Sequence, residues 1–226
     1  MQILIVGTGK LANTILLSNL ALPDCQIVEW NSFNQNEFND RAIVVHAGSG
    51  RQLDECLEFC RRTNSVFIEL STGLPTEVMS PEFTLIICPN TSILLLKTLN
   101  MLKQFGKYFS GEKVSIVESH QESKKSAPGT AYNFAEFLSY PVEEIKSVRD
   151  TEVQRGELGI PDEFLAKHAY HRITIGEEHE QITIETKVLG HDSYATGVQK
   201  IISAALQHTL EKRRYSVLDL IDLKIL

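Results

Sequence analysis

An apolar run followed at once by a glycine-rich turn opens the sequence and limits the fold more than any other feature. Residues 3–6 read Ile-Leu-Ile-Val, as expected of a strand buried on both faces in a parallel sheet. The turn Gly7-Thr8-Gly9-Lys10-Leu11-Ala12 follows, and the residues after it predict a helix through Leu20. A strand, a glycine turn and a helix with the spacing G-x-G-x-x-A are typical of a dinucleotide-binding domain.

The glycine turn supplies the first candidate binding residues. Free backbone amides at the start of a helix bind anionic groups such as a pyrophosphate, because the helix dipole adds to their partial charge. We therefore predict that four residues bind a dinucleotide: Gly7, Gly9, Lys10 and Leu11. The alternative interpretation is a tight turn that happens to be rich in glycine.

Four further short apolar runs lie in the first ninety residues, and a helix pattern separates two of them. The predicted strands cover residues 26–30, 42–46, 66–70 and 83–88, and the helix covers 52–62. This alternation predicts an α/β fold with a Rossmann-like parallel sheet. Each run ends in small or polar residues. The carboxyl ends of parallel strands line the ligand crevice of such a sheet, so the turns after them are candidate binding segments.

An acidic residue at the end of the second strand bears on the cofactor. Glu29 lies 22 residues after Gly7, where folds of this kind place a carboxylate that binds the ribose. Residues 31–36 contain no Arg or Lys that would bind a 2′-phosphate. We therefore predict NADH or NADPH with NADH favoured. The alternative is that Lys10 in the glycine turn binds a 2′-phosphate. Trp30 either flanks the adenine or is simply packed.

A charged segment in the middle of the chain carries the most reactive side chains. The run Val114–Val117 predicts a strand, and the loop from Glu118 leads to a helix that starts near Thr130. This loop contains one His and two Lys, and the helix start offers free amides. The segment therefore predicts a proton donor beside a pocket for a carboxylate. The alternative is a solvated surface loop.

The same segment resembles the signature E-A-H-H-x-x-K-x-D-A-P-S-G-T-A of the dihydrodipicolinate reductase (4-hydroxy-tetrahydrodipicolinate reductase) family. The shared residues are Glu118, His120, Lys124, Ala127, Pro128, Gly129, Thr130 and Ala131. The resemblance implies that His120 donates a proton, that Lys124 supplies a cation, and that Gly129 and Thr130 hold a substrate carboxylate.

The sequence departs from this signature at three places. Gln121 replaces the second His, Ser126 replaces the Asp, and the loop is one residue shorter. Gln121 can still donate a hydrogen bond to the substrate but carries no charge. A related reductase that acts on a different imine or keto acid is therefore an open alternative.

The resemblance extends along the chain. It covers the turns 71–73 and 89–92, the segment 191–197 and the closing segment 215–223. In the family the two turns lie beside the nicotinamide, which implies five further cofactor-binding residues: Ser71, Thr72, Gly73, Pro89 and Asn90. It also implies a dinucleotide-binding domain formed by 1–92 and 192–226, with an inserted α+β mixed-sheet domain over 93–191. The inserted domain would bind substrate and build a homotetramer.

The rest of the second half gives weaker signals. Residues 141–168 are charged and interrupted by Gly and Pro, so we expect irregular structure. Residues 170–176 and 180–186 alternate polar and apolar residues around a turn and predict a hairpin. We expect His168 and His179 to be solvated.

Composition excludes several classes of protein. The net charge is −7, which argues against a general nucleic-acid-binding protein. The start of the chain lacks the pattern of a secretory signal, and no apolar run is long enough to span a bilayer. The four cysteines show no metal-binding spacing, so we expect reduced thiols, no metal and a cytoplasmic location.

These observations predict an NADH- or NADPH-dependent reductase of a cyclic dicarboxylate. The resemblance implies the reduction of 4-hydroxy-tetrahydrodipicolinate in lysine and diaminopimelate biosynthesis. Besides the related reductase, a catalytically silent dinucleotide-binding sensor is a second alternative.

Overall fold

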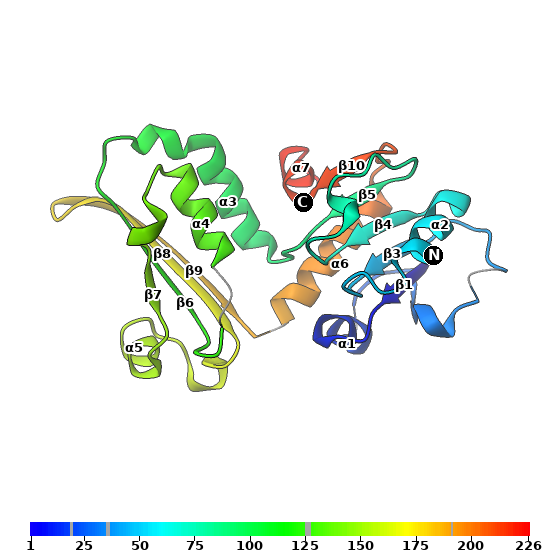
Figure 1. The fold of residues 1–226 in the computed structure, drawn as a ribbon, viewed down its shortest axis with the longest axis horizontal. Coiled ribbons are helices and arrows are strands. Elements are labelled where there is room, and N and C mark those ends of the chain that lie inside the picture. The colour runs from blue at the N-terminus through cyan, green and yellow to red at the C-terminus, as the bar shows by residue number, and fades with distance from the viewer. Residues whose placement is uncertain (19, 35–36, 125–127, 191) are drawn as a thin grey trace. The chain divides into compact units, whose positions relative to one another are not determined.

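The computed structural model describes residues 1–18, 20–34, 37–124, 128–190 and 192–226. The chain forms two compact units (Figure 1). Unit 1 comprises Met1–Ile93 and Asp192–Leu226, and unit 2 comprises Leu94–His191. The binding of a dinucleotide by the first and of a substrate by the second stays a prediction.

The sheet of unit 1 has six strands in the order β10-β5-β4-β3-β1-β2, and every neighbouring pair is parallel. The strands are β1 (Gln2–Val6), β2 (Gln26–Glu29), β3 (Ile43–His46), β4 (Val66–Glu69), β5 (Leu85–Ile87) and β10 (Arg214–Ser216). This confirms the predicted Rossmann-like fold. The chain steps from β1 to β2 on one side and continues at β3 on the other, so a ligand crevice is expected at the carboxyl ends of β1 and β3.

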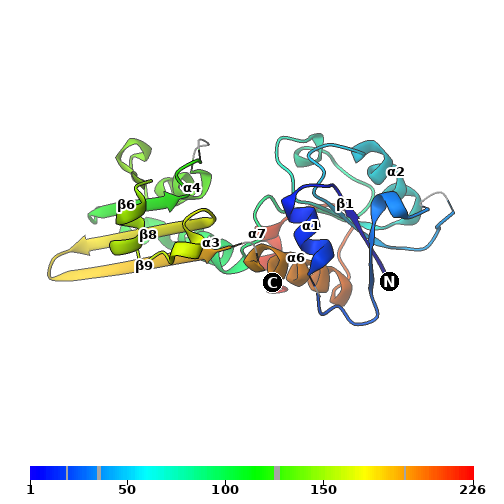
Figure 2. The ribbon, with the colours of Figure 1, turned by 90° about the horizontal axis from the view of Figure 1, so that it is seen from below.

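Helices cover both faces of this sheet. They are α1 (Lys10–Leu17), α2 (Leu53–Thr63), α6 (Asp192–Gln207) and α7 (Val217–Asp222). Figure 2 shows α1 and α6 side by side on one face and α2 on the other. The central strands are therefore buried, and Phe59 of α2 packs against Trp30 in the core.

Two glycines mark places where backbone segments meet closely. Gly7 has a φ of +122°, and a Cβ on it would lie 2.4 Å from the carbonyl oxygen of Ala47. Within α6, a Cβ on Gly197 would lie 1.6 Å from the carbonyl oxygen of Thr91. Both positions require glycine because any side chain would collide with backbone atoms. The turn after β1 therefore lies directly against the turn after β3.

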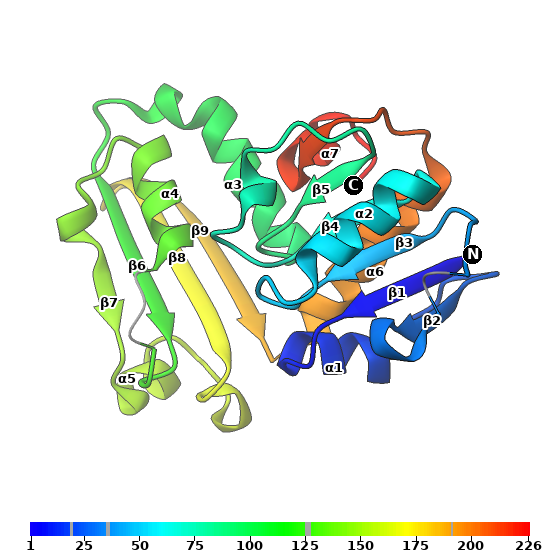
Figure 3. The ribbon, with the colours of Figure 1, turned by 45° about the vertical axis from the view of Figure 1, so that its right-hand side comes forward.

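Unit 2 is built on a mixed four-stranded sheet in the order β7-β6-β8-β9 (Figure 3). Its strands are β6 (Val114–His120), β7 (Lys146–Val148), β8 (His168–Glu177) and β9 (Glu180–Leu189). β6 is parallel to β7 and antiparallel to β8, and β8 and β9 form the predicted hairpin. The helices are α3 (Ile93–Phe105), α4 (Gly129–Phe137) and α5 (Thr151–Gly156). The predicted α+β mixed-sheet domain is thus confirmed.

Short 3₁₀ turns complete the secondary structure of the described residues. They cover Trp30–Ser32, Pro75–Glu77, Gly106–Phe109, Val142–Glu144 and Asp162–Phe164. None of the helices in the described part of the chain is long and apolar enough to cross a membrane.

Three predictions about local structure were wrong. The predicted strand 114–117 continues to His120, because Glu118, Ser119 and His120 pair with β8. The expected irregular stretch 141–168 contains β7 and α5, whose Val148, Leu158 and Ile160 pack with Tyr170. Tertiary pairing and burial outweigh the weak local signal in both places.

The third wrong prediction concerns the first helix, which ends at Leu17 rather than Leu20. Ser18 adopts an extended conformation, and both its backbone N–H and its hydroxyl donate to the carbonyl of Thr14. The hydroxyl thus competes with the next helical turn for the same acceptor.

Candidate functional site

The glycine turn of unit 1 is built to accept an anion. α1 has Gly9 as its N-cap, with no side-chain cap and no acidic residue in the first turn. A Cβ on Gly9 would meet nothing within 4 Å, so the space in front of the helix start is open. Lys10 is exposed and Leu11 is half-buried. The first amides of α1 therefore lack protein acceptors among the described side chains and can bind a phosphate.

A buried histidine and glutamate lie under the neighbouring turns at the carboxyl edge of the sheet. His46 ends β3 and Glu69 ends β4, and His46 Nδ1 lies 2.8 Å from Glu69 Oε1. His46 Nε2 donates to the carbonyl of Arg51 at 3.0 Å, and Glu69 Oε1 accepts the N–H of Ser71 at 2.8 Å. Both side chains are fully buried, so water cannot replace a missing hydrogen bond. A hydrogen therefore lies between Nδ1 and Oε1, because two lone pairs would otherwise face each other.

This pair ties together the turn after β3 and the turn after β4. A further hydrogen bond joins the two turns, from the N–H of Ser49 to the hydroxyl of Ser71. Sequence reasoning missed both residues of the pair, because they lie at the ends of apolar runs that predict only buried strands. Their identity as a pair depends on the register of β3 with β4.

The other residues predicted for unit 1 lie at the same edge. Glu29 is half-buried at the end of β2 and forms no ion pair with a described residue. Thr72 and Gly73 are exposed in the turn after β4, and Asn90, after Pro89, accepts the N–H of Ser92 in the turn after β5. The structure thus gathers these residues at the carboxyl ends of neighbouring strands. Trp30 is buried against Phe59, so it is packed in the core and does not flank a ligand.

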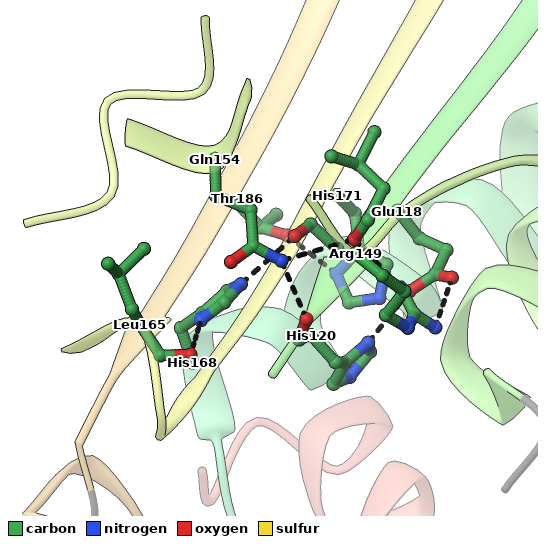
Figure 4. A network of polar contacts seen from close by, with 10 residues as sticks. Glu118, His120, Arg149, Gln154, Leu165, His168, His171 and Thr186 are labelled. Carbon is green, nitrogen blue, oxygen red and sulfur yellow. Dashed lines mark hydrogen bonds and ion pairs between the residues drawn. The ribbon is translucent and has the colours of Figure 1, made fainter. Parts of the chain in front are cut away.

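Unit 2 gathers its polar residues on one face of its sheet, where α4 packs. Side chains alternate between faces along a strand, so Glu118 and His120 of β6 point the same way. Ser147 of β7 pairs with Glu118 and lies on that face, as does Arg149 two residues later. His171 of β8 lies directly opposite Glu118. Figure 4 shows Glu118, His120, Arg149 and His171 close together.

The carboxylate of Glu118 is the centre of this cluster. Its Oε2 lies 2.7 Å from His120 Nδ1, and its Oε1 accepts from Arg149 Nη2 at 2.7 Å. The side chain of Glu118 is fully buried, whereas His120 is 14% exposed. Burial raises the pKa of this carboxyl group, but hydrogen bonds from His120, Arg149 and Ser147 outweigh burial and lower it to about 2. Glu118 is therefore ionised at neutral pH.

His171 is a neutral, buried neighbour of His120. The rings of His120 and His171 meet edge to face with centroids 5.9 Å apart. The ring of Phe134 in α4 also contacts His171, with ring centroids 5.5 Å apart. Its Nδ1 lies 3.1 Å from the hydroxyl of Thr186, and its Nε2 is buried without a partner among the described residues. Burial and, secondly, the nearby His120 lower the pKa of His171 to about 3.

The remaining predicted substrate residues follow β6. Gln121 and Lys124 are half-buried in a turn closed by the Lys124 N–H and the Gln121 carbonyl. No described residue forms an ion pair with the Lys124 ammonium group. Gly129 starts α4, which has no side-chain cap and no acid in its first turn, and Thr130 follows it. Ser126 and Ala127, and His191 of the later segment, lie outside the described residues.

The expectation that His168 is solvated was wrong. His168 is 4% exposed on β8, and its Nδ1 donates to the carbonyls of Phe164 and Leu165, each at 3.1 Å. Its Nε2 therefore accepts the hydroxyl of Ser119 at 3.0 Å. Burial lowers the pKa of His168, in keeping with a neutral ring. His179 is exposed in the hairpin turn, as expected.

Comparison with known proteins decides the family. The model of the family described as "Dihydrodipicolinate reductase, C-terminus" matches residues 94–222, more than half of the chain. The chain belongs to the dihydrodipicolinate reductase family.

Relatives of this family are found in plants. The probable 4-hydroxy-tetrahydrodipicolinate reductase 1, chloroplastic, of Oryza sativa subsp. japonica is 32% identical over 134 residues. The 4-hydroxy-tetrahydrodipicolinate reductase 1, chloroplastic, of Arabidopsis thaliana is 33% identical over 131 residues. Each alignment covers 54% of this chain and 38% of the relative, so the chain matches well under half the length of these proteins.

A solved structure shows the same fold over nearly the whole chain. It is the dipicolinate-bound dihydrodipicolinate reductase from Paenisporosarcina sp. TG-14, with a TM-score of 0.64 and 18% sequence identity. The superposition covers 96% of this chain and 97% of that one. At 18% identity this similarity supports the fold of both units and nothing further.

Sequence reasoning missed Arg149, the partner of Glu118, and Gln154, the partner of His120. Arg149 and Gln154 come from the stretch that was expected to be irregular, and Gln154 donates to the carbonyls of His120 and Val148 at 2.8 and 3.2 Å. His171 was left without a role. The alternation of the hairpin strands gave a signal for the face that His171 occupies, but no local pattern pointed to Arg149 or Gln154.

The neutral ring of His171 predicts that acid destabilises the fold. Between pH 6.5 and the folded-state pKa of about 3, His171 is protonated in the unfolded chain but neutral in the native protein. Stability therefore falls as pH drops through this window, by about 2 kcal/mol between pH 7 and pH 5 from this group. Over the same pH range, the free energy of unfolding of the variant His171→Gln should fall by about 2 kcal/mol less than that of the unchanged protein. Urea unfolding followed by circular dichroism measures this difference.

The matched control is His179→Gln, because His179 is exposed in the same hairpin. This variant should show the same pH dependence as the unchanged protein. An equal loss of stability in His171→Gln and the unchanged protein would show that His171 titrates normally in the native state.

Proposed function

We propose that this protein is an NADH- or NADPH-dependent reductase that converts 4-hydroxy-tetrahydrodipicolinate to tetrahydrodipicolinate in lysine and diaminopimelate biosynthesis. The observation that carries the proposal is the pair of His120 and the ionised Glu118 on the substrate unit of a dihydrodipicolinate reductase family member. Family membership and the names of the plant relatives support the substrate class.

The residues of unit 1 suit a nicotinamide dinucleotide. The open helix start at Gly9 fits a pyrophosphate, and the carboxylate of Glu29 fits a ribose hydroxyl. The turns with Ser71, Thr72, Gly73, Pro89 and Asn90 would hold the nicotinamide end. When bound, the cofactor supplies the hydride for the imine-type carbon of the substrate.

Unit 2 would supply the acid and the carboxylate binding. The 4-hydroxyl group of the substrate leaves as water, which gives a conjugated imine. His120 would give a proton to this imine as the hydride arrives, so that one of its double bonds is reduced. Lys124, whose ammonium group lacks an ion pair with any described residue, would neutralise a substrate carboxylate. The amides of Gly129 and Thr130 at the start of α4 would orient it, and Gln121 would donate a further hydrogen bond.

The role of His120 is tested by the variant His120→Gln. Activity is assayed by oxidation of the cofactor with 4-hydroxy-tetrahydrodipicolinate as substrate. Because general acid catalysis contributes about 10²–10⁴-fold, kcat should fall by about a hundredfold or more. Cofactor affinity should not change, because His120 belongs to the substrate unit.

His179→Gln is the control variant and should keep full activity. Full activity of His120→Gln would refute the assigned acid. An unchanged protein that binds the dinucleotide but reduces no dicarboxylic imine would be the silent sensor, and one that reduces only other imines would be the related reductase.

The preference for NADH is tested at Glu29. We expect tighter binding of NADH than of NADPH, because the carboxylate repels a 2′-phosphate. The variant Glu29→Gln should narrow this difference, as measured by titration of cofactor fluorescence. Glu37→Gln, which changes an exposed carboxylate in the following connection, should leave it unaltered. Equal affinities for both cofactors in the unchanged protein would contradict the assignment.

We further propose a homotetramer that assembles through unit 2. The ten-residue strand β9 lies at the edge of its sheet and pairs with β8 alone among the described strands. Its side chains are largely exposed, including Ile182 at 49%, and edge strands of this length invite pairing. A tetramer mass in light scattering after size exclusion is expected, and Ile182→Lys should reduce it. A monomer at all concentrations would contradict this assembly.

A further inference from the structure

The carboxylate of Glu118 is held from three sides. His120, Arg149 and Ser147 all donate hydrogen bonds to it, and the first two do so at 2.7 Å. The side chain of Glu118 is 0% exposed, and burying a charge is unfavourable unless the charge is paired. The three hydrogen bonds compensate for this loss of contact with water. The arrangement fixes where each oxygen of the carboxylate points.

The charge of Glu118 settles which nitrogen of His120 carries a hydrogen. An ionised carboxylate has lone pairs and no proton, so it can only accept. His120 Nδ1 must therefore be the donor in this contact. The neutral ring then has its lone pair at Nε2, and the protonated ring has an exchangeable proton there.

The backbone of His120 is fixed as well. Gln154 is fully buried, and its amide nitrogen donates to the carbonyl of His120 and to that of Val148. These two carbonyls belong to the ends of β6 and β7. Gln154 thus clamps the strand ends that carry His120 and Arg149, and ring and backbone are held independently.

We propose that Glu118 and Arg149 are positioning residues that set the tautomer of His120, so that Nε2 alone exchanges a proton with the substrate. The structural half of this proposal stands on the contacts of unit 2. The catalytic half rests on the proposed function, in which His120 is the acid. Both the protonated ring and the neutral ring left after proton transfer keep Nδ1–H on Glu118, so the contact need not change during turnover.

Arg149 makes the proposal specific, because it governs what a neutral replacement of Glu118 would do. A glutamine at this position has one oxygen and one NH₂ group. Arg149 has donors and no acceptor, so it would claim the oxygen. The NH₂ group would then face His120 Nδ1 and donate to it. Glu118→Gln should therefore move the ring hydrogen to Nε2 and disfavour the protonated ring.

The tautomer is read by NMR of protein labelled with ¹⁵N-histidine, a measurement that does not depend on activity. In the unchanged protein the neutral form of His120, identified by its loss in His120→Gln, should be the Nδ1–H tautomer. In Glu118→Gln it should be the Nε2–H tautomer. In the double variant Glu118→Gln with Arg149→Met, the amide can turn its oxygen to His120, and the Nδ1–H form should return.

Kinetics test the catalytic half. Glu118→Gln should lower kcat by about a hundredfold with little change in KM, because the wrong tautomer and a neutral ring cannot supply the proton. The double variant should recover part of that loss. Glu185→Gln is the matched control, since Glu185 accepts from Arg172 and Lys187 on the same sheet without touching His120. It should keep kcat.

The two halves fail in different ways. An unchanged tautomer in Glu118→Gln would overturn the positioning role, whatever the activity. The expected tautomers together with a fully active His120→Gln would uphold the positioning of the ring and refute His120 as the acid of the proposed reaction. Equal losses of kcat in Glu118→Gln and in Glu185→Gln would also overturn the positioning role, because a general loss of structure would explain both.

Discussion

The buried carboxylate of Glu118 is the interaction on which the polar face of unit 2 depends. It brings together two strands and the residue that follows β7, since Ser147, Arg149 and His120 all bond to it. Removing one partner from a buried ion pair typically costs about 3–5 kcal/mol, because the other charge is left uncompensated. The partners of the buried carboxylate are partly exposed, His120 at 14% and Arg149 at 26%.

Unit 1 uses a comparable device at the edge of its parallel sheet. His46 and Glu69 lie at the ends of adjacent strands and hold the turns that follow β3 and β4. In both units, a fully buried glutamate at a strand end bonds a histidine and anchors segments that carry predicted binding residues. Polar groups buried in this way favour this arrangement of the turns, because breaking these hydrogen bonds would leave further buried donors or acceptors unpaired.

Much of the architecture was readable from local patterns. The apolar run and glycine turn at residues 3–12 predicted β1 and the start of α1, and the later apolar runs predicted the other strands of the first half. Period-two alternation predicted the β8–β9 hairpin. The string from Glu118 to Ala131 predicted the family through side chains that are close in sequence. These features are local, so a short window of residues contains the information that decides them.

The contacts around His120 were decided by tertiary structure alone. The sequence by itself determined that a histidine and a glutamate lie two residues apart near a strand end, and that lysine and a helix start follow. It did not determine that the strand continues to His120 or that His168 is buried. Nor did it determine that Arg149 bonds Glu118 and Gln154 bonds His120 from a segment without local signal. The physical reason is that strand pairing and desolvation depend on residues far apart in the chain, which come together only when β6, β7 and β8 adopt their register.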